Sequence, residues 1–317
     1  MDDLLHQFAS MIKSEAQRLG FNACGISKAE FLEQDAIRLK EWLENGFNGD
    51  MRYMENNFEK RTDPSKLLPG AQSVISVSLN YYPSKAQADR YAPVLARYAY
   101  GKDYHAVIKK RLFLLLAFIE NIFQKVNGRV FTDSGPLLEK ACAARAGLGW
   151  PGKNTTLISK QFGSFFLIGT IIIDKELHYD RPVRDYCGTC KKCLEACPTG
   201  ALLQPHIIDA RRCIAYHTIE NRHNNDHIRV LNLSNRVFGC DICQEVCPWN
   251  SKAIPHNLEE FEPPAGLLDM TCSEWHNLSE VEFNRLFKKG APGRTGYITI
   301  KRNLEVLKSQ LQERKCP

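Results

Sequence analysis

The chain has 317 residues, of which 44% are hydrophobic, so it can form one large domain with a buried core and a smaller second one. A net charge of +6 does not by itself indicate nucleic-acid binding. The most apolar run, FFLIGTIII at 165–173, is about half the length of a membrane-spanning helix. The acidic N-terminus lacks a signal-peptide cleavage site, so we expect a cytoplasmic protein that does not bind a membrane.

The first 175 residues predict alternating helices and strands. An apolar stripe at helical spacing over 3–19 indicates a helix that ends at Gly20, and a strand at 21–27 and a helix at 29–45 follow. The further elements expected are a strand at 73–82, a helix at 103–126, a strand at 129–135, a helix at 136–147, and a β-hairpin over 155–173 that turns near Phe162.

The pattern predicts three segments. Residues 1–175 form a mixed α/β ligand-binding domain, and residues 176–255 form a ferredoxin-like domain with two clusters. Residues 256–317 form a short C-terminal extension that is partly helical. The charged stretch 174–185 is the expected linker between the first two segments.

Twelve cysteines without an export signal indicate metal ligands rather than disulfides. One motif, starting at Cys187, is Cys-x2-Cys-x2-Cys-x3-Cys-Pro, the bacterial ferredoxin run whose fourth cysteine ligates the other cluster. A second motif, FGCDICQEVCPWN, lacks the first cysteine of that run, and Cys213 can replace it. The two complete sets are Cys187, Cys190, Cys193 with Cys247, and Cys197, Cys213, Cys240 with Cys243.

The spacing favours two 4Fe–4S clusters over zinc. Short loops supply three thiolates to each cluster, and the crossed fourth ligand holds the clusters close enough for single electrons to pass between them. A zinc ribbon uses two Cys-x2-Cys pairs and does not explain both Cys-Pro endings. The cysteines outside the pattern are expected to be ordinary thiols: Cys24, Cys142, Cys272 and Cys316.

A candidate ligand site lies in FTDSGPLLEKACAARAGLGWPGKNTTLIS, residues 131–159. Asp133 is expected between the end of a strand and the start of a helix, where α/β folds bind ligands. The alternative is that Asp133 only caps the next helix, a role that Asn fills equally well. Lys153, Asn154 and Thr155 offer polar contacts further along. No Gly-x-Gly-x-x-Gly follows a strand, so no nucleotide-cofactor fingerprint is present.

These segments together resemble the epoxyqueuosine reductases, cobalamin-dependent iron–sulfur enzymes that complete queuosine in tRNA. The resemblance covers most of residues 40–250. It is carried by GFNGDMRYM (46–54), RYAYGKDYH (97–105), the segment 131–159 and the two cysteine motifs.

The resemblance implies a cobalamin in residues 1–175 and a substrate epoxide on the wobble base of a tRNA anticodon stem-loop. It also implies an external low-potential electron donor, and we expect a monomer. Asp133 matches the family's proton donor. The residues matched or assigned by segment to the cobalamin site are Arg61, Tyr98, Asp133, Lys153, Asn154, Thr155 and Ser159.

The implied reaction is consistent with the cluster chemistry. Removing the epoxide oxygen as water takes two electrons and two protons, and clusters deliver electrons singly, so a cofactor that accumulates them is needed. A carboxyl in a pocket suits protonation of the leaving oxygen, because burial favours its neutral form.

Two other functions remain open from the residues. One is a cobalamin-dependent reductase of the reductive dehalogenase kind, and the other is a ferredoxin-type module that passes electrons to a partner enzyme. The segment around Asp133 argues against a bare carrier, which needs no substrate pocket.

Two basic segments are open to interpretation. The family often has a helical-repeat domain after the cluster domain, whereas residues 250–317 are too few for several repeats. Either tRNA contacts or a solvated tail explains Lys288, Lys289, Arg294, Lys301 and Arg302. The basic insertion between Cys213 and Cys240 is either a flap over the ligand or a cover over the clusters.

Overall fold

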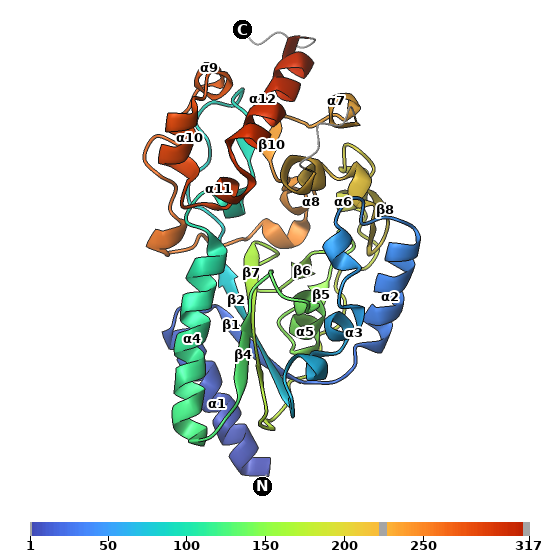
Figure 1. The fold of residues 1–317 in the computed structure, drawn as a ribbon, viewed down its shortest axis with the longest axis vertical. Helices are drawn as coiled ribbons and strands as arrows, with labels where there is room; N and C mark the ends of the chain where they lie inside the picture. The colour runs from blue at the N-terminus through green and yellow to red at the C-terminus, as the bar shows by residue number, and fades with distance from the viewer. Residues whose placement is uncertain (1, 222–226, 313–317) are drawn as a thin grey trace.

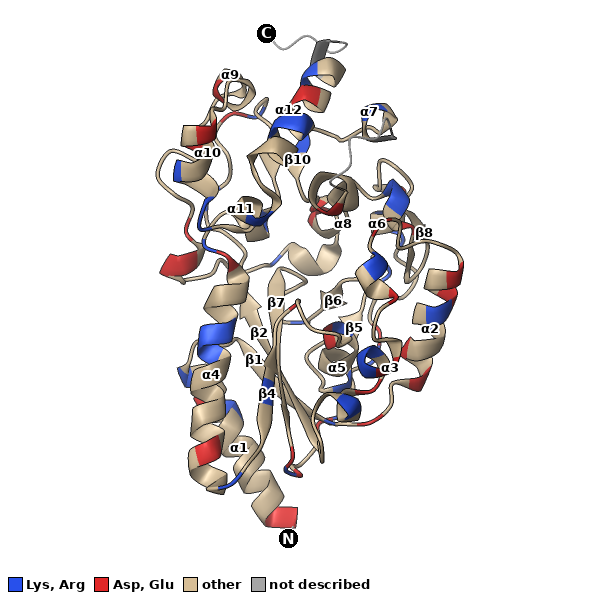
Figure 2. Cartoon of the chain, viewed as in Figure 1, with Lys and Arg blue, Asp and Glu red and all other residues tan. Residues whose placement is uncertain are grey.

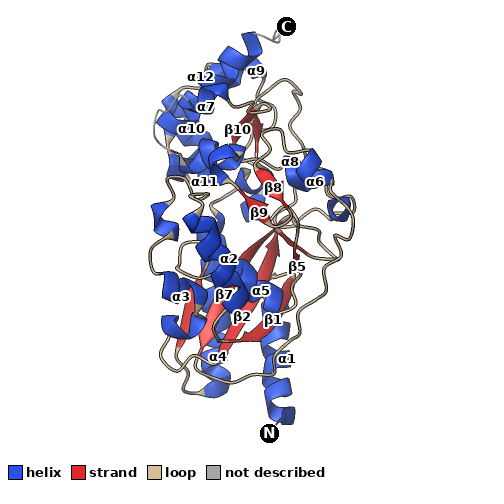
Figure 3. Ribbon diagram, turned by 90° about the vertical axis from the view of Figure 1, so that its right-hand side faces the viewer, coloured by secondary structure: helices blue, strands red, loops and turns tan. Residues whose placement is uncertain are grey.

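The computed structural model describes residues 2–221 and 227–312 as a mixed α/β protein. In Figure 1 a β-sheet and its covering helices form the end of the molecule that carries the N-terminus, and the C-terminal helices form the other end. The side view in Figure 3 shows the same arrangement, with the short strands of the cysteine-rich segment beyond the sheet. Within the described ranges, no helix is long and apolar enough to cross a membrane.

The central sheet is antiparallel, in the order β1-β2-β7-β4. Its strands are β1 (Ala23–Lys28), β2 (Ser73–Asn80), β7 (Phe166–Ile173) and β4 (Gly128–Phe131). All of β2 is buried, because helices cover both faces of the sheet. Successive side chains point to opposite faces, so Ile75 and Val77 enter one core while Val74 enters the other.

Helices α1 (Asp2–Arg18) and α4 (Tyr104–Phe123) cover one face of the sheet (Figure 1). Ile12 of α1 and Leu112 of α4 are fully buried against it. Close approach of α4 to β7 requires Gly169, since a Cβ there would lie 2.7 Å from Ile108 Cγ2.

The other face is covered by α5 (Glu139–Arg145), and α2 (Glu33–Glu44) and α3 (Phe58–Thr62) lie on that side (Figure 1). The core beneath them joins Leu32, Val74, Phe131, Leu137 and Ile172.

The cysteine-rich segment contains mostly short elements. They are α6 (Lys192–Glu195), β8 (Leu202–Gln204), β9 (Ile207–Ile208), α7 (His227–Val230), β10 (Arg236–Phe238) and α8 (Ile242–Glu245). Strand β10 runs parallel to β3 (Val94–Leu95), which joins this segment to the N-terminal part of the chain.

The C-terminal helices share a second hydrophobic core with the segment around residues 92–100. These helices are α9 (Cys272–His276), α10 (Glu280–Phe287), α11 (Ala291–Thr295) and α12 (Tyr297–Gln312). Trp275, Phe287 and Leu304 pack there with Ala99 and Phe238. The extension is therefore packed onto the rest of the protein and is not a free tail.

The expected hairpin over 155–173 is wrong. The chain closes a tight bridge between Ser159 and Gly163, and β7 then enters the sheet between β2 and β4. Strand β6 (Leu157–Ile158) pairs instead with β5 (Trp150–Pro151). The turn near Phe162 is formed by neighbouring residues and can be predicted from sequence, whereas β2 and β4, the partners of β7, are distant in sequence.

Two helices also begin at residues other than those expected from the sequence. Helix α5 begins at Glu139 because residues 132–138 form a turn in which Leu137 N–H donates to Gly135 O. Helix α2 begins at Glu33, since Ala29 N–H still donates to Gln72 O beside the sheet.

Candidate functional site

Asp133 lies in the loop that follows β4, in a left-handed backbone conformation with φ of +58°. Its side chain is 65% exposed and accepts a hydrogen bond from the Tyr104 hydroxyl. His105 Nε2 lies 3.5 Å from the same carboxylate. The N-cap of α5 is Leu138, without a side-chain cap, so the alternative that Asp133 caps this helix is wrong.

His105 links Asp133 to a second carboxylate. Asp103 caps α4 by accepting a hydrogen bond from His105 N–H, and its carboxylate also lies 2.7 Å from His105 Nδ1. The start of α4 therefore places His105 between two carboxylates, with Nδ1 toward Asp103 and Nε2 toward Asp133.

This arrangement favours placing the proton that His105 and Asp133 share on the His105 imidazole. Burial alone would lower the pKa of His105, but hydrogen bonds to Asp103 and Asp133 outweigh it and hold that pKa above its ordinary value. Hydrogen bonds from His105 and Tyr104 hold the pKa of Asp133 below its ordinary value. The two shifts favour the proton on the imidazole over the carboxyl, which differs from the expectation of a carboxyl kept neutral by burial.

Glu139 is a second proton-holding group in this loop. Its carboxyl accepts a hydrogen bond from the backbone N–H of Asp133. Burial, chiefly, raises the pKa of Glu139 to about 8. The Asp133 loop is thus supported from inside by a carboxyl that is largely protonated at neutral pH.

Tyr53, Arg61, Tyr98 and Glu220 line the surroundings of Asp133. Burial and then the charges of Glu220 and Asp133 raise the pKa of Tyr53 to about 12. Burial also raises the pKa of Tyr98, with Asp133 and Glu220 among the charges that add to it. Tyr98 packs edge-on against Tyr104, with ring centroids 5.9 Å apart.

Arg61 is buried and donates from Nη2 to Tyr53 O over 2.8 Å. Its Nε is buried and has no hydrogen-bond partner in the described part of the chain. Such a donor indicates a missing acceptor, which a bound ligand can supply.

The C-terminal extension reaches this site through Arg294 of α11. Arg294 Nη1 lies 2.5 Å from Nδ1 and 2.7 Å from Nε2 of His105. Lys289 O accepts a hydrogen bond from Asp103 N–H. Arg302, in contrast, donates to the carbonyls of His217 and Asn221. The solvated-tail interpretation is therefore wrong for Arg294 and Arg302.

The structure groups eight cysteines in two sets. The first thiol set is Cys187, Cys190, Cys193 and Cys247, and the second thiol set is Cys197, Cys213, Cys240 and Cys243. In the first set, burial and then the charges of Cys247 and Cys187 raise the pKa of Cys193. In the second set, burial and then the charges of Cys240 and Cys213 raise the pKa of Cys243.

The eight thiols do not form a ready-made site for a single metal ion, since among the described residues no three of them lie within 4.8 Å of one another. All of the described cysteines are free of disulfides. Cys24 and Cys142 lie outside both sets, and burial raises the pKa of each to about 12. Cys316 lies outside the described residues.

The remaining predicted ligand residues face the cysteine loops or α5. Lys153 Nζ donates to Gly188 O and Cys190 O, and Asn154 Nδ2 donates to Cys243 O. Thr155 O accepts from Lys140 Nζ. Ser159 Oγ accepts from Gln161 N–H inside its own turn, and no described hydrogen bond joins it to Asp133.

The segment 46–54 contacts the turn that follows Cys213. Tyr216 Oη accepts from Asp50 N–H and donates to the Asp50 carboxylate. Gly49 has a φ of +56°, and a Cβ there would lie 2.7 Å from Tyr216 Oη, so only glycine fits this contact. The buried His217 bonds Arg211 O, so this part of the insertion after Cys213 is packed. Residues 222–226 of the insertion lie outside the described residues.

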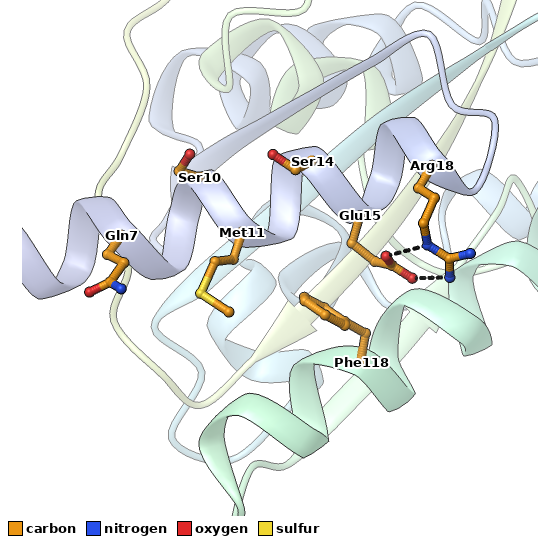
Figure 4. A pocket seen from close by; sticks show the side chains of 7 residues that line it. All are labelled: Gln7, Ser10, Met11, Ser14, Glu15, Arg18 and Phe118. Carbon is orange, nitrogen blue, oxygen red and sulfur yellow. Dashed lines mark hydrogen bonds and ion pairs between the residues drawn. The ribbon is translucent and has the colours of Figure 1, made fainter.

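A surface groove elsewhere carries none of this chemistry. It lies between α1 and α4 and is lined by residues such as Met11, Glu15, Arg18 and Phe118 (Figure 4). Arg18 is paired with Glu15 there. The candidate site is instead the Asp133 surroundings and the two thiol sets.

Sequence reasoning missed Asp103, Tyr104, His105 and Glu139 as site residues. The first three stand in the quoted motif RYAYGKDYH, where Asp followed two residues later by His is also an ordinary helix start. Only the packing of α4 beside β4 brings them to Asp133.

An α/β domain with an acid–imidazole site and two four-thiol sets defines an iron–sulfur oxidoreductase. Comparison with family models agrees with this class: Epoxyqueuosine reductase QueG, DUF1730, matches residues 61–134, and the 4Fe-4S double cluster binding domain matches residues 186–250. An epoxyqueuosine reductase from Cellulophaga algicola is 48% identical over 95% of this chain and 98% of its own length.

Solved structures agree. The crystal structure of an epoxyqueuosine reductase with a tRNA-Tyr epoxyqueuosine-modified stem loop superposes with a TM-score of 0.87, at 30% identity, over 95% of this chain and 81% of that one. The Bacillus subtilis enzyme, with its catalytic aspartate loop swung out of the active site, gives 0.86 at 31% identity, over the same shares of the two chains. The chain belongs to the epoxyqueuosine reductase family.

Proposed function

We propose that this reductase converts epoxyqueuosine to queuosine at the wobble position of tRNA, with Asp133 as the proton donor and cobalamin as the cofactor beside it. Residues 1–175 hold the cobalamin and substrate, residues 176–255 hold two 4Fe–4S clusters, and residues 256–317 complete the site through Arg294. The observation that carries the proposal is the contact of Asp133 with His105, in surroundings that also include Tyr98, Tyr53 and the buried Arg61.

The residues present fit a cobalamin. Its corrin ring carries amide side chains, and the buried Arg61 Nε is a donor without a partner in the described chain. Tyr53 and Tyr98 offer ring surfaces and hydroxyls in the same surroundings. Asn154 and Thr155 would contribute from the side of the thiol sets. When bound, cobalamin supplies a low-valent metal that stores reducing equivalents next to the substrate.

The chain's own residues then handle the protons. The epoxide oxygen leaves both carbons as water, which consumes two electrons and two protons and leaves a C=C bond. His105 passes one proton to Asp133, and Asp133 donates it to the oxygen, which would otherwise leave as an alkoxide; solvent water supplies the second proton. Asp103 holds the imidazole in position and offsets its charge.

The thiol sets supply the electrons. Each set is assigned one 4Fe–4S cluster, and the ferredoxin-type cysteine spacing and the match to the 4Fe-4S double cluster binding domain support this. A built acid–imidazole site also favours an enzyme over a plain electron-transfer module.

The test is anaerobic purification followed by three measurements: iron and sulfide content, the absorbance spectrum with and without added cobalamin, and turnover of an epoxyqueuosine-bearing anticodon stem-loop. We expect two clusters per chain, a cobalamin spectrum altered by binding, and queuosine as product. A protein that has both clusters but neither binds cobalamin nor turns over the stem-loop would contradict the proposal.

A further inference from the structure

The two thiol sets lie in different surroundings. In the second set, Cys240 follows Gly239, where a Cβ would lie 3.5 Å from Tyr98 Cε1, and Tyr98 packs on Tyr104 beside Asp133. The second set is thus connected to the acid–imidazole site through two aromatic rings.

The loop between the first two thiols of the first set faces outward. A Cβ on Gly188, between Cys187 and Cys190, would meet open space, and Thr189 beside it is exposed. All eight thiols are partly buried, so the two sets differ in their neighbours: the first set lies beside this open loop, and the second lies next to Tyr98.

Exposed cations lie beside the first set. We call this group the basic entry face, and its members are Lys160, Arg184, Lys191 and Lys192. In the described part of the chain, no carboxylate lies within salt-bridge distance of any of the four, whereas Arg97, Arg111 and Arg236 are all paired. The exposed acids next to them in sequence are Asp185 and Glu195, so this face has a net charge of four minus two, or +2. Figure 2 shows the basic start of α6 on this side.

An aromatic group supports the basic entry face and connects it to a thiol. Lys160 Nζ lies 3.9 Å from the centre of the Tyr186 ring, and Arg184 Cζ lies 4.7 Å from it. Tyr186 packs on Trp150 at 5.2 Å, and the buried Trp150 donates from Nε1 to Cys187 Sγ over 3.4 Å. Lys160 and Arg184 are therefore held over the Tyr186 ring, and Trp150 links that ring to Cys187 of the first set.

Resting on the proposed function, we infer that the basic entry face docks a small acidic protein that carries single electrons, which it delivers to the first cluster. Each encounter oxidises the carrier by one electron and reduces the cluster by one, and two encounters supply the two electrons that one epoxide consumes. Charge complementarity of this kind speeds encounter and weakens with salt. RNA is the less favoured occupant, because Arg294 and Lys289 already provide basic groups beside His105 and Asp103.

The experiment follows the reduction of the clusters by stopped-flow absorbance, using reduced flavodoxin as the acidic carrier and photoreduced deazariboflavin as a small neutral reductant. The variants are Lys191→Glu with Lys192→Glu, and, further from the thiols, Lys160→Ser with Arg184→Ser. The matched control is Lys109→Glu with Lys110→Glu, an adjacent exposed pair on α4. Iron content is measured first for each protein.

We expect the second-order rate with flavodoxin to fall about tenfold or more at low salt for the Lys191/Lys192 variant, and the difference to shrink at about 0.5 M salt. The rate with deazariboflavin and the affinity for the tRNA stem-loop should remain unchanged, and the control pair should react at the wild-type rate. Equal slowing by the control, or loss of stem-loop affinity without slower reduction, would overturn the inference. Two clusters that deazariboflavin reduces without any epoxide turnover would instead count against the proposed function. If the Lys191/Lys192 variant loses iron, the Lys160/Arg184 variant replaces it as the test of carrier docking, with the same rates and the same stem-loop affinity measured.

Discussion

His105 Nε2 and the carboxylate of Asp133 lie 3.5 Å apart, although the first residue starts a helix and the second ends a loop. The pKa of His105 is raised and that of Asp133 is lowered, so the pair stores its proton on the imidazole. On the proposed function, we expect His105 to resupply Asp133 with a proton during the reaction.

Asp133→Asn tests the donor. Asn keeps the shape and the hydrogen bond from Tyr104, but it has no proton to give. In single turnover with pre-reduced, cobalamin-loaded enzyme and epoxide-bearing tRNA, we expect the rate to fall by roughly a hundredfold or more. Iron and cobalamin content should be normal. A near-normal rate with full cofactor content would remove Asp133 from the chemistry, and loss of cobalamin would make it a structural contact.

The rate should also depend on pH through His105. The pKa of His105 in the folded protein lies above the ordinary value of 6.5. The imidazole therefore carries its proton below pH 6.5 and loses it as the pH rises through the raised pKa. We expect the single-turnover rate to fall at alkaline pH, which gives the pH profile an alkaline limb. Because the enzyme is reduced beforehand, this fall does not reflect the supply of electrons. His105→Gln keeps a donor toward Asp133 but should be slow at every pH and lack this limb. A wild-type limb retained in the variant would assign it to another group.

Arg294→Ala should move that limb. The positive charge of Arg294 lowers the pKa of His105, so its removal should raise this pKa and shift the limb to higher pH. Arg285→Ala is the control, since Arg285 is paired with Glu282 on α10. No shift, or the same shift in the control, would show that Arg294 does not act on the imidazole.

Cys213→Ala tests the grouping of the thiols. Its loss should remove one cluster, leaving about four iron and four sulfide per chain instead of about eight of each. Cys24→Ala should keep both clusters, because this thiol belongs to neither set. Full iron in the Cys213 variant, measured on anaerobically purified protein, would contradict the assignment.

Glu139→Gln should change the dependence of stability on pH. The folded pKa of about 8 lies above the ordinary value of 4.5, so Glu139 favours the folded state below pH 4.5 and this contribution is lost as the pH rises toward about 8. The slope is at most about 1.4 kcal/mol per pH unit. Gln stays neutral and still accepts from Asp133 N–H. The melting temperature of the Glu139→Gln variant, relative to that of wild type, should therefore rise between pH 5 and about pH 8.

Glu59→Gln, an exposed carboxyl paired with Lys66, provides the comparison for Glu139. A difference between wild type and Glu139→Gln that stays constant with pH would show that Glu139 is ionised throughout this range.

Local rules predicted some features and missed others for identifiable reasons. The thiol sets could be predicted because short cysteine loops force their ligands together, and the place of Asp133 followed from its position after a strand. The partners of Asp133 come from α4, about thirty residues earlier, and nothing in the local pattern separates an Asp103 that positions His105 from an ordinary helix cap. The position of β7 between β2 and β4 likewise depends on pairings between distant residues.

The contact of Tyr216 with Gly49 and Asp50 ties cofactor assembly to the order of the active site. Tyr216 lies in the turn that starts at Cys213, where His217 N–H donates to Cys213 O. A cluster that fixes Cys213 therefore also fixes Tyr216, and through it the segment that leads to Tyr53. If Cys213 holds a cluster as proposed, we expect the 46–54 segment to gain hydrogen-exchange protection when iron and sulfide are incorporated.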